Sequence, residues 1–537
     1  MTTKALTHSV AILWVATWLS SCSSSDGVTG SSQPPKDPTP SCAGPFTGTS
    51  PPPARSCSAT IPFDPTDPLW GYQWHLDNLA QTCGTAGEDI NVDTVWATLK
   101  GNGVRVVVVD NGMELTHEDL SPNVVAGSYD YSDGDANPDS GNSDHGTAVG
   151  GVIAARDLNN LGMRGVAPRA ELIAYNLLDA LTSANAADAM TRNAPSNFVS
   201  SNSWGAPDGY GTLDAADANW LTAIATGLAN GRSNRGLIYV WAGGNGAPVD
   251  NSNYDGQANR RGVIAVGATT DTGTKAYYSE RGANLWVSAP GGSSSCIGRI
   301  ATTDASAGAG YNPVDTGGAD LSNQNYSKCF GGTSAATPVV SGVVALVLQA
   351  RPTLTWRDVP IILARSARKN DVGNAGWSNN GAGHPVNHDY GFGVVDAQAA
   401  VTLASTWTNV GAEVVYGPTT ASPNLRIPDN NCTGVSSTIT VNGSGISEIE
   451  WVEVTFTAAN HTYSGDLDIA LTAPSGTVSR LAERHPCSGC TRYSGWVFGS
   501  ARHLDEPANG NWTLTVKDLE AVDVGTFQSW SLKIYGH

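Results

Sequence analysis

Positive charge is scarce in this sequence of 537 residues. Lys and Arg together number 29 against 48 Asp and Glu, which leaves a net charge of −19 at pH 7. We therefore expect no nucleic acid partner, because nothing would offset the repulsion of the phosphates. Charged residues of both signs make up only 14% of the chain. The excess of acid fits cationic substrates or bound cations better.

The N-terminus lacks an apolar run long enough to cross a membrane as a stable helix. Its run "SVAILWVATWL" follows Lys4 and is short, so residues 1–22 predict an export signal that is removed. The ending "LSSC" resembles the lipobox of bacterial lipoproteins, in which Cys22 would carry the lipid. An ordinary secretory signal that ends near a cysteine is the alternative. We expect an exported protein, periplasmic, extracellular or held at the outer membrane only by that lipid anchor.

The nine cysteines lack the pattern of a zinc site. Setting Cys22 aside leaves an even number, which predicts disulfides in an oxidising compartment. Eight cysteines allow ~105 pairings, so the connectivity stays open. The stretch "CSGC" at 487–490 could also bind zinc, but beyond His485 no second cysteine pair or histidine cluster completes four ligands. Disulfides are therefore the better interpretation.

The chain is too long for one ordinary core, which suggests two folded domains. Residues 23–66 are rich in Ser, Pro, Thr and Gly and predict a tether. In residues 67–404, strand-like runs alternate with helical stretches, which predicts an α/β domain with a parallel sheet and helices on both faces. Residues 411–537 carry closely spaced β-branched and aromatic runs, which predict a separate all-β sandwich.

Four separated motifs in the first domain carry chemistry-bearing side chains. Asp110 ends "VRVVVVD", His145 opens "HGTAVGG", Asn245 lies in "GGNG" and Ser334 in "GGTSAATP". Taken singly, the Asp means little, such a His is more often structural, and a Ser before a helix is more often a cap. Taken together, each sits at a strand end or helix start in a glycine-rich setting. This order predicts a nucleophilic serine with a base, an orienting acid and an oxyanion donor.

These motifs resemble the subtilisin-like serine proteases, whose chain order is Asp, His, Ser. The resemblance rests on "VVVVDNGMELTHEDL", "DHGTAVGGVIAA", "SSNSWG", "GGNG" and "GGTSAATPVVSG" and spans about residues 67–404. "GDLDIALTAPSGT" and "GNWTLTVKDLEAVDVGTFQSWSLKIYG" are similar to the P-domain that follows the catalytic domain in the kexin and furin convertases. The resemblance implies a subtilisin-like α/β peptidase domain followed by a jelly-roll-like P-domain at 411–537.

The activity that the resemblance implies is peptide hydrolysis through an acyl-enzyme. Ser334 would attack the carbonyl carbon, and His145 would take its proton and return it to the leaving amine. Asp110 would orient the imidazole. Asn245, with the backbone N–H of Ser334, would hold the oxyanion.

The resemblance also implies a specificity pocket beside Ser203, Trp204 and Gly205. Asp208 and Asp255 match its acids, and two carboxylates in one pocket favour a substrate cation, so we expect cleavage after Arg or Lys. One alternative is that these are solvated loop acids and the protease is broad in specificity. Another is a non-catalytic, surface-binding lipoprotein with a degenerate first domain, which conflicts with the intact catalytic set.

Calcium is implied by the same resemblance, at two sites and a weaker third. Carboxylate and amide oxygens are the ligands that this ion prefers. The first site would use Asp208, Asp250 and Glu280. The second would use Asp67, Asp119 and Asn160, and the third candidate is the acidic loop with Asp130 and Asp135.

Three features depart from the convertases. Asn111 stands where a second Asp usually follows the catalytic one, which puts a basic preference at the second substrate position in doubt. "HGTAVGG" lacks the cysteine that many convertases carry just after the His. Residues 23–66 are too few and too rich in proline for a folded prodomain, so folding would depend on an external chaperone or on none. We expect a monomer.

Overall fold

The structure is a computed structural model that describes residues 51–53, 55–139, 141, 143–313, 320–487, 489–490 and 492–537. The predicted signal at 1–22 with Cys22, and residues 23–50 of the predicted tether, lie outside the described residues. The described residues belong to one compact unit.

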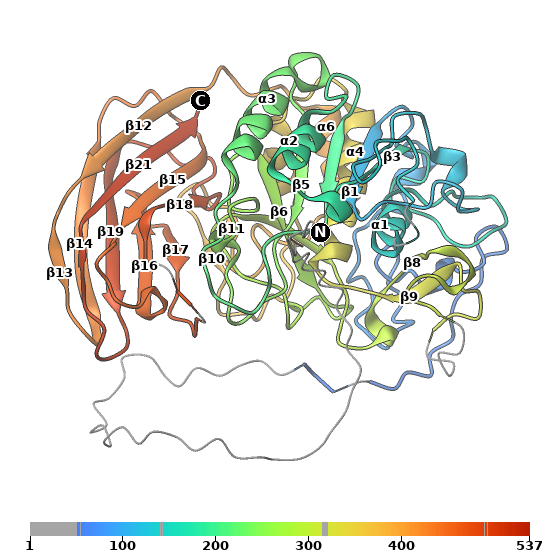
Figure 1. Ribbon diagram of the computed structural model, residues 1–537, viewed down its shortest axis with the longest axis horizontal. Helices are drawn as coiled ribbons and strands as arrows, with labels where there is room; N and C mark the ends of the chain where they lie inside the picture. Colours follow the sequence, from blue (N-terminus) through green and yellow to red (C-terminus); the bar gives the residue numbers. More distant parts are fainter. Residues whose placement is uncertain are drawn as a thin grey trace, which may run out of the picture. The chain divides into compact units, whose positions relative to one another are not determined.

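A seven-stranded parallel sheet forms the centre of the first domain (Figure 1), in the order β2-β3-β1-β4-β5-β6-β7. Its strands are β1 (Arg105–Asp110), β2 (Tyr129–Asp130), β3 (Glu171–Asn176), β4 (Val199–Asn202), β5 (Ile238–Ala242), β6 (Val263–Thr269) and β7 (Leu285–Pro290). The run of valines in β1 is buried on both faces of the sheet, as expected for a central parallel strand. Asp110 is the last residue of that strand, so it lies at the carboxyl edge, where α/β proteins gather their functional groups.

Helices cover both faces of this sheet. They are α1 (Asp144–Ala154), α2 (Ser183–Thr191), α3 (Ala218–Asn234), α4 (Thr333–Ala350), α5 (Asp358–Ser366) and α6 (Ala397–Ser405). Met190 of α2 and Trp220 of α3 share a hydrophobic cluster with Val107. Val106 faces the opposite side, in a cluster with residues of α1, α4, α5 and α6. The predicted α/β class with helices on both faces is confirmed.

Helix α4 is the core helix of this domain. Among the described residues it is the one helix whose length and composition would suit a membrane span, and 83% of it is buried inside the protein. That burial identifies it as a core element. Pro338 lies in its second turn.

The described end of the predicted tether packs onto the peptidase domain. Arg55 forms an ion pair with the buried Asp271, and Cys57 is bonded to Cys83. Asp64 accepts a hydrogen bond from Arg164 at 2.6 Å. Residues 55–66 are therefore held against the domain, because they supply ion-pair and disulfide partners that the composition alone did not reveal.

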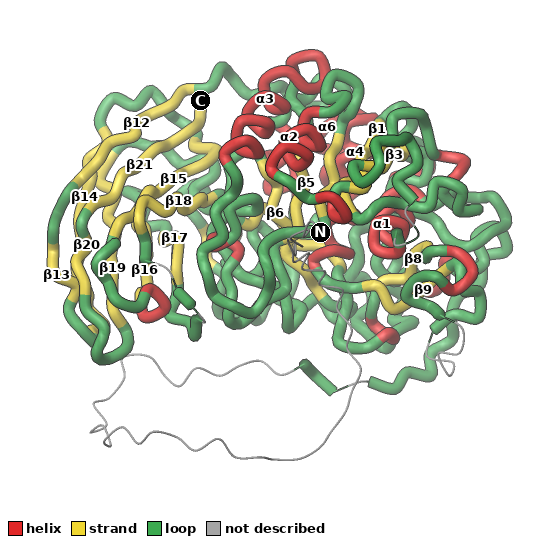
Figure 2. Tube along the Cα trace, viewed as in Figure 1, coloured by secondary structure: helices red, strands yellow, loops and turns green. Residues whose placement is uncertain are grey.

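The C-terminal part is an all-β sandwich, as predicted, and strand and loop dominate after α6 (Figure 2). Two four-stranded antiparallel sheets, β12-β21-β15-β18 and β14-β19-β16-β17, enclose one hydrophobic cluster. The strands are β12 (Val414–Ala421), β13 (Leu425–Ile427), β14 (Asn431–Val441), β15 (Ile449–Thr457), β16 (Leu467–Thr472), β17 (Val478–Ala482), β18 (Ser494–Ser500), β19 (Gly510–Asp518), β20 (Gly525–Phe527) and β21 (Ser529–Gly536). Short pairs elsewhere are β8 (Ile300–Thr303) with β9 (Tyr326–Phe330), and β10 (Ser378–Asn379) with β11 (Pro385–Val386).

Candidate active site

The predicted acid and base meet at the carboxyl edge of the sheet. Asp110 Oδ1 lies 2.8 Å from Nδ1 of His145, which lies in the first turn of helix α1. Burial lowers the pKa of His145, but the charge and the hydrogen bond of Asp110 outweigh burial and leave that pKa raised. Phe330 packs edge-on against the imidazole at 5.5 Å between ring centres. Because Nδ1 is committed to Asp110, Nε2 is the nitrogen available for a substrate or a nucleophile.

Asn111 holds the start of the helix that carries His145. Its Oδ1 accepts from the backbone N–H of Gly146 at 2.9 Å, and its Nδ2 donates to Asp144 at 3.1 Å. The first turn of a helix has N–H groups without helical partners, and Asn111 satisfies one of them. The sequence identified Asn111 only as a departure from the convertases and did not predict this positioning role.

Ser334 and Ser203 are joined by a reciprocal pair of hydrogen bonds. The hydroxyl of Ser334 donates to the carbonyl oxygen of Ser203 at 3.2 Å, and the hydroxyl of Ser203 donates to the carbonyl oxygen of Ser334 at 3.0 Å. That second carbonyl is free because Pro338, four residues later, has no N–H to donate. Pro338 therefore leaves the carbonyl oxygen of Ser334 free to accept from Ser203, and this hydrogen bond holds the start of α4 against the end of β4.

Asn245 lies against the same helix start. Its Oδ1 accepts from the backbone N–H and the hydroxyl of Thr333, at 2.8 and 2.9 Å. This commits the oxygen and orients the amide with Nδ2 as its donor. Gly332, with φ of +96°, makes the turn that the chain needs here. The structure thus places Asn245 beside Ser334, whose own N–H lies in the first turn of α4.

The two predicted pocket acids lie near the "SWG" stretch. A Cβ added to Gly205 would lie 3.9 Å from Oδ2 of Asp255, and Trp204 packs edge-on against Trp241 at 4.7 Å. Asp208 accepts from the backbone N–H of Asn245 at 2.7 Å. Asp208 lies at the exposed rim, yet desolvation of its carboxyl group raises its pKa. Burial, and then the charges of neighbouring acids, raise the pKa of Asp255 well above its usual range.

Matches to family models identify the family of this chain. Residues 101–393, more than half of the chain, match the Subtilase family, and residues 449–534 match the Proprotein convertase P-domain. The chain belongs to the subtilase family.

Known relatives share both domains of this subtilase. It is 34% identical over 501 residues to "Proprotein convertase subtilisin/kexin type 7" of Homo sapiens, covering 90% of this chain and 61% of that protein. It is 32% identical over 504 residues to "Neuroendocrine convertase 2" of Bos taurus, covering 89% and 75%. The chain therefore spans about three fifths of the first relative's length.

Solved structures agree with the fold of this subtilase. The serine protease of Aeromonas sobria superposes with a TM-score of 0.80 at 27% identity, covering 90% of this chain and 97% of that one. The complex of that protease with its chaperone gives the same TM-score at 26% identity, covering 88% and 96%. The α/β domain followed by an antiparallel P-domain is thus an established arrangement.

Four acids of this subtilase form one electrostatic cluster, Asp208, Asp250, Asp255 and Glu280. Glu280 is 1% exposed, and its Oε1 accepts from the backbone N–H of Gly246 at 2.9 Å while its Oε2 is buried without a hydrogen-bond partner. Burial, followed by the charges of Asp255, Asp208 and Asp250, raises the pKa of Glu280 well above its usual range. A buried carboxylate oxygen without a donor fits a cation.

Two acids of the second predicted calcium group accept hydrogen bonds from one loop, residues 158–163. Asp67 accepts from the backbone N–H of Leu158 at 2.8 Å, and Asp119 accepts from that of Met163 at 2.9 Å. Burial raises the pKa of Asp67 to about 6 and that of Asp119 to about 7. Arg164 already pairs with Asp67 at 2.5 Å. Asn160, in the same loop, has a φ of +63° and donates its backbone N–H to Thr66 at 2.8 Å.

The carboxylates of the third predicted calcium group do not meet at one point. Asp130 accepts from the backbone N–H of Ser132 at 2.6 Å and from Asn176 at 2.9 Å, while Asp135 accepts from the backbone N–H of Asn137 at 2.7 Å. Each acid is satisfied in its own turn. Among the described residues, the one group of three acid, His or Cys side chains with ligand atoms within 4.8 Å of one another is His485, Cys487 and Cys490.

The sulfur atoms of that last group are not available to a metal. Cys487 and Cys490 form a disulfide with each other. A separate disulfide elsewhere in the chain joins Cys296 to Cys329. The preference for a disulfide over zinc in "CSGC" agrees with this structure. His485 instead contacts the peptidase domain, as described below.

Proposed function

We propose that this protein is a serine endopeptidase that cleaves through an acyl-enzyme, with Asp110, His145 and Ser334 as its catalytic groups. The observation that carries the proposal is the hydrogen bond of 2.8 Å between Asp110 and His145 in a chain of the subtilase family. Ser334 begins the buried helix next to Asn245, where an activated serine needs its oxyanion donors.

Each group has a defined role in this mechanism. The Ser334 oxygen bonds to the peptide carbonyl carbon while its proton moves to Nε2 of His145, and Asp110 stabilises the imidazolium. Nδ2 of Asn245 and the N–H of Ser334 donate to the oxyanion, and loss of one such donor costs ~10²–10³ in turnover. The C–N bond then breaks, His145 protonates the amine, and water hydrolyses the acyl-enzyme by the same steps in reverse.

Labelling with a fluorophosphonate tests this proposal, because the reagent modifies only an activated serine. Wild type should react at Ser334 and digest unfolded protein, and Ser334→Ala should do neither while it stays folded. Ser341→Ala is the matched control, since that serine is buried in the same helix and should not matter for labelling. Retention of more than about a hundredth of the turnover in Ser334→Ala contradicts the assignment.

We infer that the enzyme cleaves after Arg or Lys. Asp208 and Asp255 lie near the "SWG" stretch, and burial raises the pKa of both carboxyl groups. A substrate guanidinium would supply a balancing charge. Changing either acid to Asn should lower kcat/KM for Arg substrates at least tenfold, about 1.4 kcal/mol, and leave an apolar substrate almost unchanged. Equal losses on both substrates contradict the pocket.

We propose structural calcium at the cluster of Asp208, Asp250 and Glu280, and a second ion near Asp67, Asp119 and Asn160. The buried, unpaired Oε2 of Glu280 supports the first site. Bound calcium would supply positive charge that keeps these carboxylates ionised inside the fold. Isothermal titration of calcium into chelator-treated protein tests this, and absence of binding contradicts it.

We further propose that the protein is exported, through residues 1–22, and that a separate chaperone assists its folding. The solved protease of Aeromonas sobria forms a complex with a chaperone, and this chain shares its fold. Mass spectrometry of the exported protein tests the first point, since a lipid on Cys22 adds a defined mass. Refolding of the denatured chain alone to full activity contradicts the second.

A further inference from the structure

One short segment of the P-domain touches the peptidase domain beside the proposed specificity pocket. We call residues 483–487 the latch segment; they follow β17 and lead into the disulfide between Cys487 and Cys490. The segment is far from the pocket acids in sequence, and the contact between His485 and Gly211 spans 274 residues.

The first contact holds the chain after Asp208. Nε2 of His485 donates to the carbonyl oxygen of Gly211 at 2.9 Å. The fit is close, because a Cβ on Gly211 would lie 2.6 Å from Cδ2 of the imidazole and 2.8 Å from the carbonyl oxygen of Pro486. The backbone N–H groups of Gly209 and Gly211 both donate to Asp250. The imidazole therefore fixes a loop that also orients an acid of the cluster.

The second contact holds the residue before Asp255. Tyr254 is 1% exposed and belongs to the hydrophobic cluster of the P-domain. Its ring lies against that of His485 at 4.9 Å between centres, and its hydroxyl lies 3.3 Å from the carbonyl oxygen of Glu483, to which it donates. The backbone at Asp255 is thus anchored through a side chain that is buried in the other domain.

The third contact holds the residue after Glu280. Arg281 pairs with Glu483 at 3.0 Å, and its other nitrogen pairs with Asp389 at 3.1 Å. Burial lowers the pKa of Arg281, but the charges of Glu483 and Asp389 outweigh it and leave the guanidinium firmly charged. The latch segment therefore contacts the chain within three residues of three separate acids of the cluster.

We propose that the latch segment positions the acids of the specificity pocket, with His485 as its principal positioning residue. This inference rests on the proposed preference for basic residues. Acids that repel one another move apart unless the backbone beneath them is held, and the pocket loop takes part of its support from the P-domain. The P-domain then determines substrate choice as well as stability, although His485 itself does not touch the substrate.

Two measurements on the full chain test the inference. In His485→Ala, kcat/KM for a peptide with Arg before the scissile bond should fall about tenfold more than for the same peptide with Leu. Amide exchange at Gly209 and Gly211 should become about tenfold faster. His485→Gln keeps a donor for Gly211 and should recover most of both effects. His537→Ala is the control, since that imidazole pairs with Glu450 in the same domain, 2.8 Å away, and should change neither.

The outcomes separate this inference from the proposed specificity. Wild type without a preference for Arg contradicts the proposed specificity, and the exchange rates still decide whether the latch segment holds the loop. Unchanged exchange at residues 209–211 in His485→Ala overturns the inference. Equal effects of His485→Ala and His537→Ala on exchange and on the Arg-to-Leu ratio also overturn it, because they indicate general loosening of the domains.

Discussion

At the scale of single residues, the pair of Asp110 and His145 has a measurable consequence for pH. The base must be neutral to accept a proton, so activity is lost as pH falls through the pKa of His145. Asp110 raises that pKa above its ordinary value of about 6.5, so the acid limb of kcat/KM should lie above pH 6.5. In Asp110→Asn the largest opponent of burial is lost and only the charge of Asp144 still raises the pKa of His145, so the limb should move below that of wild type as kcat falls by ~10⁴.

A pH profile of kcat/KM for both proteins checks this prediction. The contrary result is an acid limb at the same pH in wild type and Asp110→Asn, which would mean that Asp110 does not set the protonation of His145.

Ser203 gives a second prediction at this scale. Ser203→Ala leaves the carbonyl oxygen of Ser334 without its donor, since Pro338 cannot supply one. The free energy of unfolding should fall by about 1–3 kcal/mol, the cost of an unpaired polar group, and kcat should fall because the nucleophile is less well held. Ser341→Ala removes another hydroxyl of helix α4. That hydroxyl donates to the hydroxyl of Ser201 and to the carbonyl oxygen of Thr337. Ser341→Ala should lower stability without lowering kcat, and an equal loss of kcat in both variants contradicts the positioning role.

Local patterns predicted where the four candidate residues lie, because each is in a glycine-rich stretch. Asp110 ends β1, His145 and Ser334 lie in the first turns of α1 and α4, and Asn245 lies in the loop after β5. The roles of Thr333 and Asn111 were missed, since each depends on one hydrogen bond between distant segments.

At the scale of elements, the calcium that we propose would stabilise the acid loops around Glu280. An ion that binds the native cluster and scarcely the unfolded chain should stabilise by ~2.7 kcal/mol at a hundredfold excess over its Kd. Chelation, with exchange long enough to release held ions, should lower the melting temperature and the activity together. Glu280→Gln should reduce this dependence while Asp135→Asn, in a loop that satisfies its own acids, should not. A melting curve unchanged by chelator contradicts the site.

The strands and helices themselves follow from sequence patterns, with exceptions of physical interest. The alternation of strand-like runs and helical stretches predicted the parallel sheet, and its central strand β1 and its helix α4 are both buried. Residues 55–66 were expected to be a tether because they are rich in proline. Their attachment depends on Arg55 and Cys57 meeting partners that lie far along the chain, which composition does not encode.

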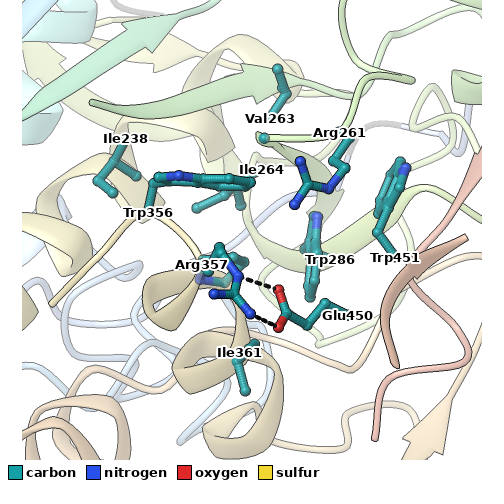
Figure 3. Close-up of a pocket in the computed structure, with 12 residues that line it drawn as sticks. Ile238, Arg261, Val263, Ile264, Trp286, Trp356, Arg357, Ile361, Glu450 and Trp451 are labelled. Atoms are coloured by element: carbon teal, nitrogen blue, oxygen red, sulfur yellow. Dashed lines mark hydrogen bonds and ion pairs between the residues drawn. The ribbon is translucent and has the colours of Figure 1, made fainter. Parts of the chain in front are cut away.

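At the scale of the whole molecule, the two domains share a buried ion pair. Arg357 of the peptidase domain pairs with Glu450 of the P-domain, which is 6% exposed, beside the stacked rings of Trp286 and Trp451 (Figure 3). A cavity of about 20 Å³ lies there, lined by residues of both domains.

Removing one partner of that pair should therefore cost far more than replacing both. Arg357→Ala leaves a buried carboxylate without its main counter-charge, and the free energy of unfolding should fall by about 3–5 kcal/mol. Arg357→Met combined with Glu450→Met should cost much less. Unfolding in guanidinium checks this, and both domains should unfold in one transition. Two separate transitions in wild type contradict the shared interface.

The contacts between domains were the least predictable part of the molecule. Sequence patterns indicated two domains of different class, because alternating and β-rich segments differ locally. Nothing local indicates that Tyr254 is buried among P-domain residues or that His485 reaches Gly211. Such contacts join two surfaces, and the sequence of neither surface carries a local pattern that marks it as an interface.

The central claim is that this subtilase cleaves peptides after basic residues by means of Ser334. Its most direct test is kcat/KM of the wild-type protein for four matched peptides with Arg, Lys, Phe or Leu before the scissile bond, with Ser334→Ala as background. The account predicts that the Arg and Lys peptides are cleaved at least tenfold more efficiently than the Phe and Leu peptides, and that Ser334→Ala cleaves none. Equal cleavage of all four peptides, or cleavage that survives in Ser334→Ala, would contradict it.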